Sequence, residues 1–246
     1  MADRPTVSVV VYRIEHHKDA PCLFALRNQT YADFELIVVD GSKGVSAARN
    51  EGIRRSSSDI IAFTEADGIP AQDWVEKTIF HMRNEHGITG RVVHPANDVY
   101  RLISRQFDQG DEEKYTSILS GGNMAFRKEV FSEVGLFDEN LEWAFNETEF
   151  SFRYLRKYRL KYCPDAVLTH YYARNLLHYL KKQFLCGKSA LYVWRKQGLA
   201  GGEIMRRTII RRLPFTKLSL VASLGIIFLD LGIVYAKLRH PEKLKP

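Results

Sequence analysis

The 246-residue sequence is poor in cysteine, and its three cysteines, Cys22, Cys163 and Cys186, lie far apart without any CxxC pair. Their number and spacing exclude a disulfide framework and a zinc-binding pattern, and favour reduced thiols in a cytosolic setting. The sequence also lacks the GxGxxG, GxxxxGK[ST] and GxSxG motifs. Dinucleotide-binding, P-loop and nucleophile-elbow chemistry therefore lose their main sequence support.

Acidic residues are scarce in the C-terminal part of the chain, and the charge is divided unevenly between its two parts. Residues 1–150 hold 16 Lys and Arg against 25 Asp and Glu, a net charge of −9, whereas residues 151–246 hold 20 against 4, a net charge of +16. The chain is 45% hydrophobic and 26% charged, which is typical of a folded domain. The basic C-terminal part is expected to face an anionic partner.

Three apolar, β-branched runs alternate with helical patterns in the N-terminal half, at 7–12, 34–40 and 59–64. The intervening helices are expected at 19–28 and 45–55, and another at 71–85. This alternation predicts βαβ units and an α/β fold with parallel strands. After about residue 88 the pattern becomes mixed, with short strands expected at 118–126, 160–163 and 166–170 and helices at 127–134, 147–158 and 175–197.

The segment 218–236 is a 19-residue apolar run whose one charged residue is Asp230. Basic residues flank both of its ends, and its length is close to that of a membrane span. A buried carboxylate is costly in a bilayer, so three readings stay open: a single span, a helix in the membrane plane, or a core helix. Ser219, Ser223 and Asp230 share one helical face, which could contact a second copy of the chain.

The helix expected at 175–197 interleaves lysines with aromatic residues, a pattern found in nucleic-acid-binding proteins and at anionic membranes. The neighbouring apolar run favours lipid, and the acidic first part of the chain argues against nucleic acid. We therefore expect no nucleic-acid partner, and place the chain at the cytoplasmic face of a membrane, either peripheral or with a single span.

Acidic residues follow the expected strands. Asp40 ends the second strand, and Glu65 and Asp67 follow the third in the stretch FTEADG. Ligands of open α/β sheets bind at the carboxyl ends of the strands. These carboxylates therefore lie on the edge where a ligand, or a hard cation bound to one, is expected.

Five ordered segments together resemble family 2 glycosyltransferases with a GT-A fold, over roughly residues 6–190: NQTYADFELIVVDGS (28–42), SAARNEGI (46–53), IIAFTEADGIPAQDWVE (60–76), SGGNMAFRKEVFSEVGLFDE (120–139) and NETEFSFRYLRKYRLKYCPDAVLTH (146–170). The resemblance implies a Rossmann-like domain with a mixed central sheet. It also implies an inverting transfer from a nucleoside-diphosphate sugar with Mn²⁺ or Mg²⁺ as cofactor.

The resemblance assigns roles to particular residues. Glu65 and Asp67 take the place of the DxD element, and Asp67 with His170 is expected to hold the metal ion. The donor nucleotide and its sugar are expected to be bound by further positions: Asp40, Arg49, Glu65, Asp67, Gly122 and Asn123. The alternatives are that Asp40 caps the following turn, that Arg49 meets an acidic neighbour instead of a phosphate, and that Gly122 belongs to an ordinary bulge.

The catalytic base of an inverting transfer must take a proton from the attacking hydroxyl. The family has an acidic pair before a helix, and Asn146-Glu147 stands at that place here. Glu147 is therefore the expected base and Glu149 the second choice. Both acids could instead be favoured only by the dipole at the helix N-terminus.

These expectations combine into one hypothesis. A GT-A domain at 1–200 transfers a sugar to a lipid-linked saccharide or polyprenyl phosphate, and a C-terminal helical part at 201–246 associates with the membrane. The alternative is a non-catalytic nucleotide-sugar-binding or scaffold protein of a membrane glycan-assembly complex, which the departures Glu65 and Asn146 would fit.

Overall fold

The computed structural model describes residues 6–13, 21–198 and 217–239. Its strands are β1 (Val7–Arg13), β2 (Phe34–Asp40), β3 (Ile60–Glu65), β4 (Ile69–Pro70), β5 (Gly87–Val93), β6 (Lys114–Thr116), β7 (Asn123–Arg127) and β8 (Leu160–Thr169). Its helices are α1 (Pro21–Arg27), α2 (Val45–Arg55), α3 (Trp74–Met82), α4 (Val99–Ile103), the 3₁₀ helix η1 (Ser104–Phe107), α5 (Lys128–Val134), α6 (Asn146–Tyr154), α7 (Leu176–Lys196) and α9 (Lys217–Arg239).

The described strands form one mixed sheet in the order β2-β1-β3-β7-β5-β8-β4, with β6 paired to β8. The pairs β1–β2, β1–β3 and β5–β8 are parallel, whereas β7 runs antiparallel to both β3 and β5. The expected mixed α/β sheet is confirmed. The two short strands expected at 160–163 and 166–170 form the single strand β8, with a register shift opposite Gly90 and Arg91.

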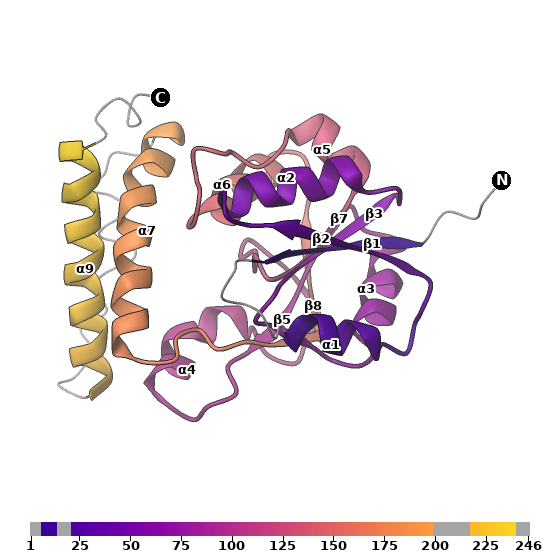
Figure 1. The fold of residues 1–246 in the computed structure, drawn as a ribbon, viewed down its shortest axis with the longest axis horizontal. Coiled ribbons are helices and arrows are strands. Elements are labelled where there is room, and N and C mark those ends of the chain that lie inside the picture. Colours follow the sequence, from indigo (N-terminus) through magenta and orange to yellow (C-terminus); the bar gives the residue numbers. More distant parts are fainter. Residues whose placement is uncertain (1–5, 14–20, 199–216, 240–246) are drawn as a thin grey trace. The chain divides into compact units, whose positions relative to one another are not determined.

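Both faces of the sheet are covered by helices, as Figure 1 shows with α2, α5 and α6 on one side and α1 and α3 on the other. Successive residues of β1 therefore point into two different cores. Val10 and Tyr12 join the cluster under α2 and α6, while Val9 and Val11 join the cluster over α1 and α3. This explains why β1 is an unbroken apolar run and does not alternate with polar residues.

The chain divides into two compact units. The first contains the sheet and comprises residues 1–95, 104–142 and 146–171, and the second comprises 96–103, 143–145 and 172–246. Helix α7 thus groups with α9 and not with the sheet, so the boundary falls near residue 171 where the sequence suggested 200. The basic stretch at 206–216 lies outside the described residues.

Candidate active site

Two carboxylates lie where β3 ends. β1 and β3 are parallel neighbours, and Tyr12 of β1 is in register with Glu65 of β3. A turn closed by the hydrogen bond from the Gly68 amide to the Glu65 carbonyl, 3.0 Å, follows directly. Ala66 points into the core, so Glu65 and Asp67 on either side of it are both turned outward and half-buried.

His170 reaches the same place from the end of β8. Its backbone amide donates to the Val93 carbonyl, 3.0 Å, and the preceding residue pairs with β4. The His170 Nε2 atom lies 3.5 Å from Glu65 Oε2 and 3.4 Å from Asp67 Oδ1. Segments about a hundred residues apart in sequence thus meet at one point.

Glu65, Asp67 and His170 could together hold a metal ion, because one ligand atom from each lies within 4.8 Å of the others. Carboxylate oxygens and imidazole nitrogen suit Mn²⁺. Asp67 and His170 were expected to be metal ligands from the sequence. Glu65, expected to reach a ribose or a metal-bound water, lies close enough to join them as a ligand.

Tyr12 is a site residue that the sequence reasoning missed. Burial and the hydrogen-bonded Glu65 carboxylate raise the pKa of Tyr12 well above its ordinary value, so the phenol stays protonated and donates to Glu65. The sequence could have indicated this contact, because Tyr12 and Glu65 both lie near the carboxyl ends of strands that are expected to be parallel.

The turn before β7 brings the backbone against Glu65. The Asn123 amide donates to the Ser120 carbonyl, 3.0 Å, which closes the turn. A Cβ atom on Gly122 would stand 3.1 Å from the Glu65 carboxyl carbon, so a larger residue there would displace that carboxylate. Gly122 therefore lies beside Glu65, and its role in binding the donor stays a prediction.

The side chain of Asn123 is committed to the sheet. Its Nδ2 donates to the carbonyls of Arg91 (2.9 Å) and Ala166 (2.8 Å), and its Oδ1 accepts from Trp74 Nε1 at 2.8 Å. Asn123 thus satisfies backbone carbonyls at the point where the pairing of β5 and β8 changes register. The expected donor-binding role of Asn123 is thus unsupported by the geometry, which gives the amide a structural role.

Arg49 is buried between α2, the glycine turn and α6. Its guanidinium donates to Asn146 Oδ1 and to the Gly121 carbonyl, 2.8 Å. The rings of Tyr12 and Phe137 lie 5.7 Å and 5.2 Å from its Cζ atom. These contacts tie three elements of the site together.

Glu147 and Glu149 differ completely in surroundings. The half-buried Glu147 begins α6 beside the glycine turn, and its carboxyl carbon is 3.5 Å from where a Gly121 Cβ would stand. Glu149 is 0% exposed and accepts from Arg153, with Oε1–Nε and Oε2–Nη2 distances of 2.8 and 2.7 Å. The geometry speaks against Glu149 as a base, because this ion pair occupies both of its oxygens.

Asp40 ends β2 on the exposed edge of the sheet. It accepts from the Ser42 amide (3.0 Å) and hydroxyl (2.7 Å), and these bonds hold the pKa of Asp40 below its ordinary value. The alternative that Asp40 caps the following turn therefore describes what the carboxylate does in this structure.

Comparison with known proteins fits this geometry. Residues 41–135 match the model of Glycosyl transferase family 2. Over 177 residues the chain is 28% identical to the glycosyltransferase AglE of Haloferax volcanii, covering 67% of this chain and 56% of that protein. Residues 41–135 of the chain are thus similar to family 2 glycosyl transferases.

Two further relatives extend the comparison. A pre-mycofactocin glycosyltransferase of Mycobacterium tuberculosis is 25% identical over 65% of this chain and 37% of its own length. A glucosyl-dolichyl phosphate glucuronosyltransferase of Haloferax volcanii is 25% identical over 54% of this chain and 56% of its own. The chain thus spans between about a third and somewhat over half of the length of these relatives.

Solved structures confirm the GT-A fold of this chain. A mannosyltransferase, PcManGT of Pyrobaculum calidifontis, in complex with GDP-Man and Mn²⁺, superposes with a TM-score of 0.60 at 17% identity, over 99% of this chain and 73% of that one. GalNAc-T7 with UDP, GalNAc and Mn²⁺ gives 0.59 at 13% identity, over 99% and 58%.

Proposed function

We propose that this chain is an inverting, metal-dependent glycosyltransferase. It would move a sugar from a nucleoside-diphosphate sugar to a hydroxyl or phosphate group of a lipid-linked saccharide or polyprenyl phosphate at the cytoplasmic face of a membrane. The observation that carries the proposal is the convergence of Glu65, Asp67 and His170 at the carboxyl ends of the sheet strands.

Glu65, Asp67 and His170 are the residues that would hold Mn²⁺ or Mg²⁺. When bound, the cation would neutralise the charge of the departing nucleoside diphosphate. Tyr12 orients Glu65 by a hydrogen bond, and Gly122 lets the backbone lie against the same carboxylate. The pairing of an acidic group with a firmly held donor is typical of metal sites that must keep a fixed geometry.

Glu147 is the residue that would accept the proton of the acceptor group. It is half-buried at the N-terminus of α6, and Arg49 fixes the position of that terminus through its bond to Asn146. Support for the acceptor class comes from the dolichyl phosphate named for one relative and from the apolar helix α9.

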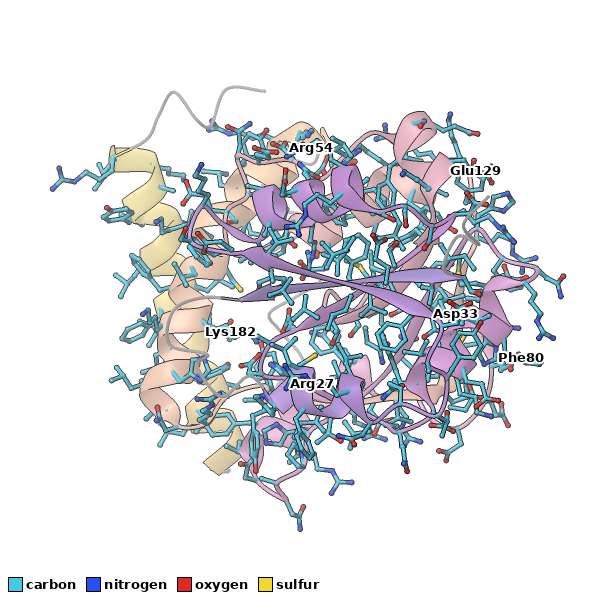
Figure 2. The ribbon with its side chains drawn as sticks, turned by 45° about the vertical axis from the view of Figure 1, so that its right-hand side comes forward. Arg27, Asp33, Arg54, Phe80, Glu129 and Lys182 are labelled. Carbon is cyan, nitrogen blue, oxygen red and sulfur yellow. The ribbon has the colours of Figure 1, made fainter. Side chains whose placement is uncertain are left out.

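The test is a transfer assay with the purified full chain. Labelled UDP-, GDP-, CDP- and dTDP-sugars are offered with Mn²⁺ and polyprenyl phosphate, and label in the organic phase is counted. With one donor class we expect transfer that Asp67→Ala removes and that Glu147→Gln lowers by about 100- to 10,000-fold. Asp33→Ala is the matched control, because this acid is exposed away from the site (Figure 2).

Two results would contradict the proposal. Transfer that survives in Glu147→Gln would remove the base assignment. A chain that binds a nucleotide but transfers from none of the donors would favour the scaffold alternative. That alternative rests on Asn146, an amide bonded to Arg49 at a position where the family has an acid.

A further inference from the structure

Helices α7 and α9 pack side by side and run in the same direction (Figure 1). Residues later in α7 contact residues later in α9, as expected for parallel helices. A Cβ on Gly225 would meet the Tyr179 hydroxyl oxygen at 2.2 Å, and one on Gly232 would meet the Phe184 carbonyl oxygen at 2.2 Å. A Cβ on Gly187 would stand only 1.9 Å from the Leu229 carbonyl oxygen. Glycines therefore allow close backbone contact, and α7 accompanies α9 through most of its length.

The side of α9 turned away from this contact is an apolar stripe. It consists of residues at helical spacings of seven, four, three and four, with exposures between 50% and 77%: Leu220, Ile227, Leu231, Val234 and Leu238. An 18-residue stretch within Leu220–Arg239 has a mean hydropathy of 1.8, and 22% of its residues are buried. Asp230 falls outside the stripe.

A row of basic residues runs along α7, parallel to the apolar stripe on α9. Lys181, Lys188 and Arg195 are seven residues apart and thus share one face of the helix. The Lys188 Nζ atom lies 5.5 Å from the centre of the Tyr235 ring on α9. Tyr235 is four residues after Leu231 and so borders the apolar stripe. The basic row therefore lies on the side of α7 next to Tyr235, which borders the apolar stripe of α9.

This arrangement decides between a helix that spans a membrane and one that lies along it. If α9 crossed a bilayer, α7 would enter with it and carry Lys181, Lys182 and Lys188 into hydrocarbon, where charged groups are costly. With both helices in the membrane plane, the apolar stripe meets the acyl chains and the basic row meets anionic headgroups.

We infer that the α7–α9 pair is a flat docking surface for an anionic bilayer, and that α9 lies in the membrane plane without crossing it. The inference deepens the membrane location in the proposed function. It stands on the contacts of α7 and α9 alone, so its test uses lipid binding and not sugar transfer.

The first experiment measures flotation of the full chain with vesicles of phosphatidylcholine alone, or of equal parts phosphatidylcholine and phosphatidylglycerol. We expect binding to the anionic vesicles that falls with added salt. Replacing Lys181, Lys188 and Arg195 by alanine should lower the affinity on the order of 100-fold. The matched control replaces Arg27, Arg54 and Arg83, which are exposed on the unit with the sheet; Figure 2 labels Arg27 on α1 and Arg54 on α2.

Equal binding by the two triple variants, or binding that ignores lipid charge, would overturn the docking surface. Ile227→Ser with Leu231→Ser tests the stripe independently, and should reduce binding to anionic vesicles while the thermal midpoint of the sheet unit stays unchanged. Binding that survives both serines would contradict the role of the stripe.

The second experiment measures depth. In a Cys186→Ser background, a fluorophore is attached at Leu220→Cys, Ile227→Cys or Leu238→Cys, and quenching by lipids brominated at different chain positions is compared. Cys22 and Cys163 are buried and stay unlabelled in the folded chain. We expect one shallow depth at all three positions. A deep Ile227 between shallow ends would show a span and overturn the inference.

Discussion

The two glutamates at the start of α6 give a matched pair of variants with opposite expected effects. Glu149→Gln removes the negative charge from the buried pair with Arg153, whose guanidinium also donates to the carbonyls of Val134 and Leu136, at 2.6 and 2.8 Å. Breaking a buried ion pair costs about 3 to 5 kcal/mol. The Arg153 side chain is 20% exposed, so water compensates in part, and the lower value of about 3 kcal/mol applies.

That loss corresponds to a fall in the thermal midpoint of about 6 to 12 °C. Glu147→Gln should leave the midpoint nearly unchanged, because a half-buried side chain at a helix terminus contributes little packing. The assay is differential scanning fluorimetry of both variants beside the transfer rate per folded molecule. We expect Glu149→Gln to be unstable yet active, and Glu147→Gln to be stable yet inactive. The reverse pattern would refute the assignment of the base.

Three further predictions test other parts of the account. Gly90→Ala places a Cβ 2.3 Å from the Ala166 carbonyl oxygen, so it should destabilise the chain by about 3 kcal/mol in urea unfolding, and an unchanged midpoint would contradict the packing at the register shift. Tyr12→Phe removes the donor to Glu65 and should weaken Mn²⁺ binding about 10-fold with the fold intact, as measured by Mn²⁺ titration; unaltered affinity would show that Tyr12 does not orient Glu65. Although burial opposes it, the hydrogen bond with His81 (2.6 Å) lowers the pKa of Asp165, so this pair stabilises the fold above the unfolded pKa of Asp165 and the benefit is lost as pH falls. The free energy of unfolding of His81→Ala should therefore depend less on pH in the acid range than that of the unsubstituted chain. The same pH dependence in both would contradict the stabilising role of the His81–Asp165 pair.

The sequence predicted the parts of the structure that depend on local pattern. The helix expected at 45–55 has those bounds, and the run that becomes β1 is a buried strand. The prediction of a buried strand at 34–40 is wrong for its burial, because β2 lies at the edge of the sheet and leaves Leu36 and Val38 exposed. The position of Glu65 and Asp67 at a strand end followed from the same alternation. The approach of His170 to them depends on β8 and β4, which only the family resemblance could place.

Side-chain partners were harder to predict because they depend on three-dimensional packing. Asn123, Arg49 and Glu149 are polar residues inside recognisable motifs, and motif position alone does not reveal that a sheet irregularity, a helix terminus or an arginine takes their hydrogen bonds. The grouping of α7 with α9 was missed for the same reason. The glycines Gly187 and Gly232 were visible in the sequence, but their contact across two helices was not.

The most direct test of the central claim is the thermal midpoint of the full chain with UDP, GDP, CDP or dTDP, each with and without Mn²⁺. A ligand that binds only the native state raises the midpoint by mass action. The account predicts that one nucleotide raises it, that the rise requires Mn²⁺, and that Asp67→Ala and His170→Ala abolish it while Asp33→Ala does not. A folded chain that shows no rise with any of the four, or a rise that persists in Asp67→Ala, would contradict the metal–diphosphate site.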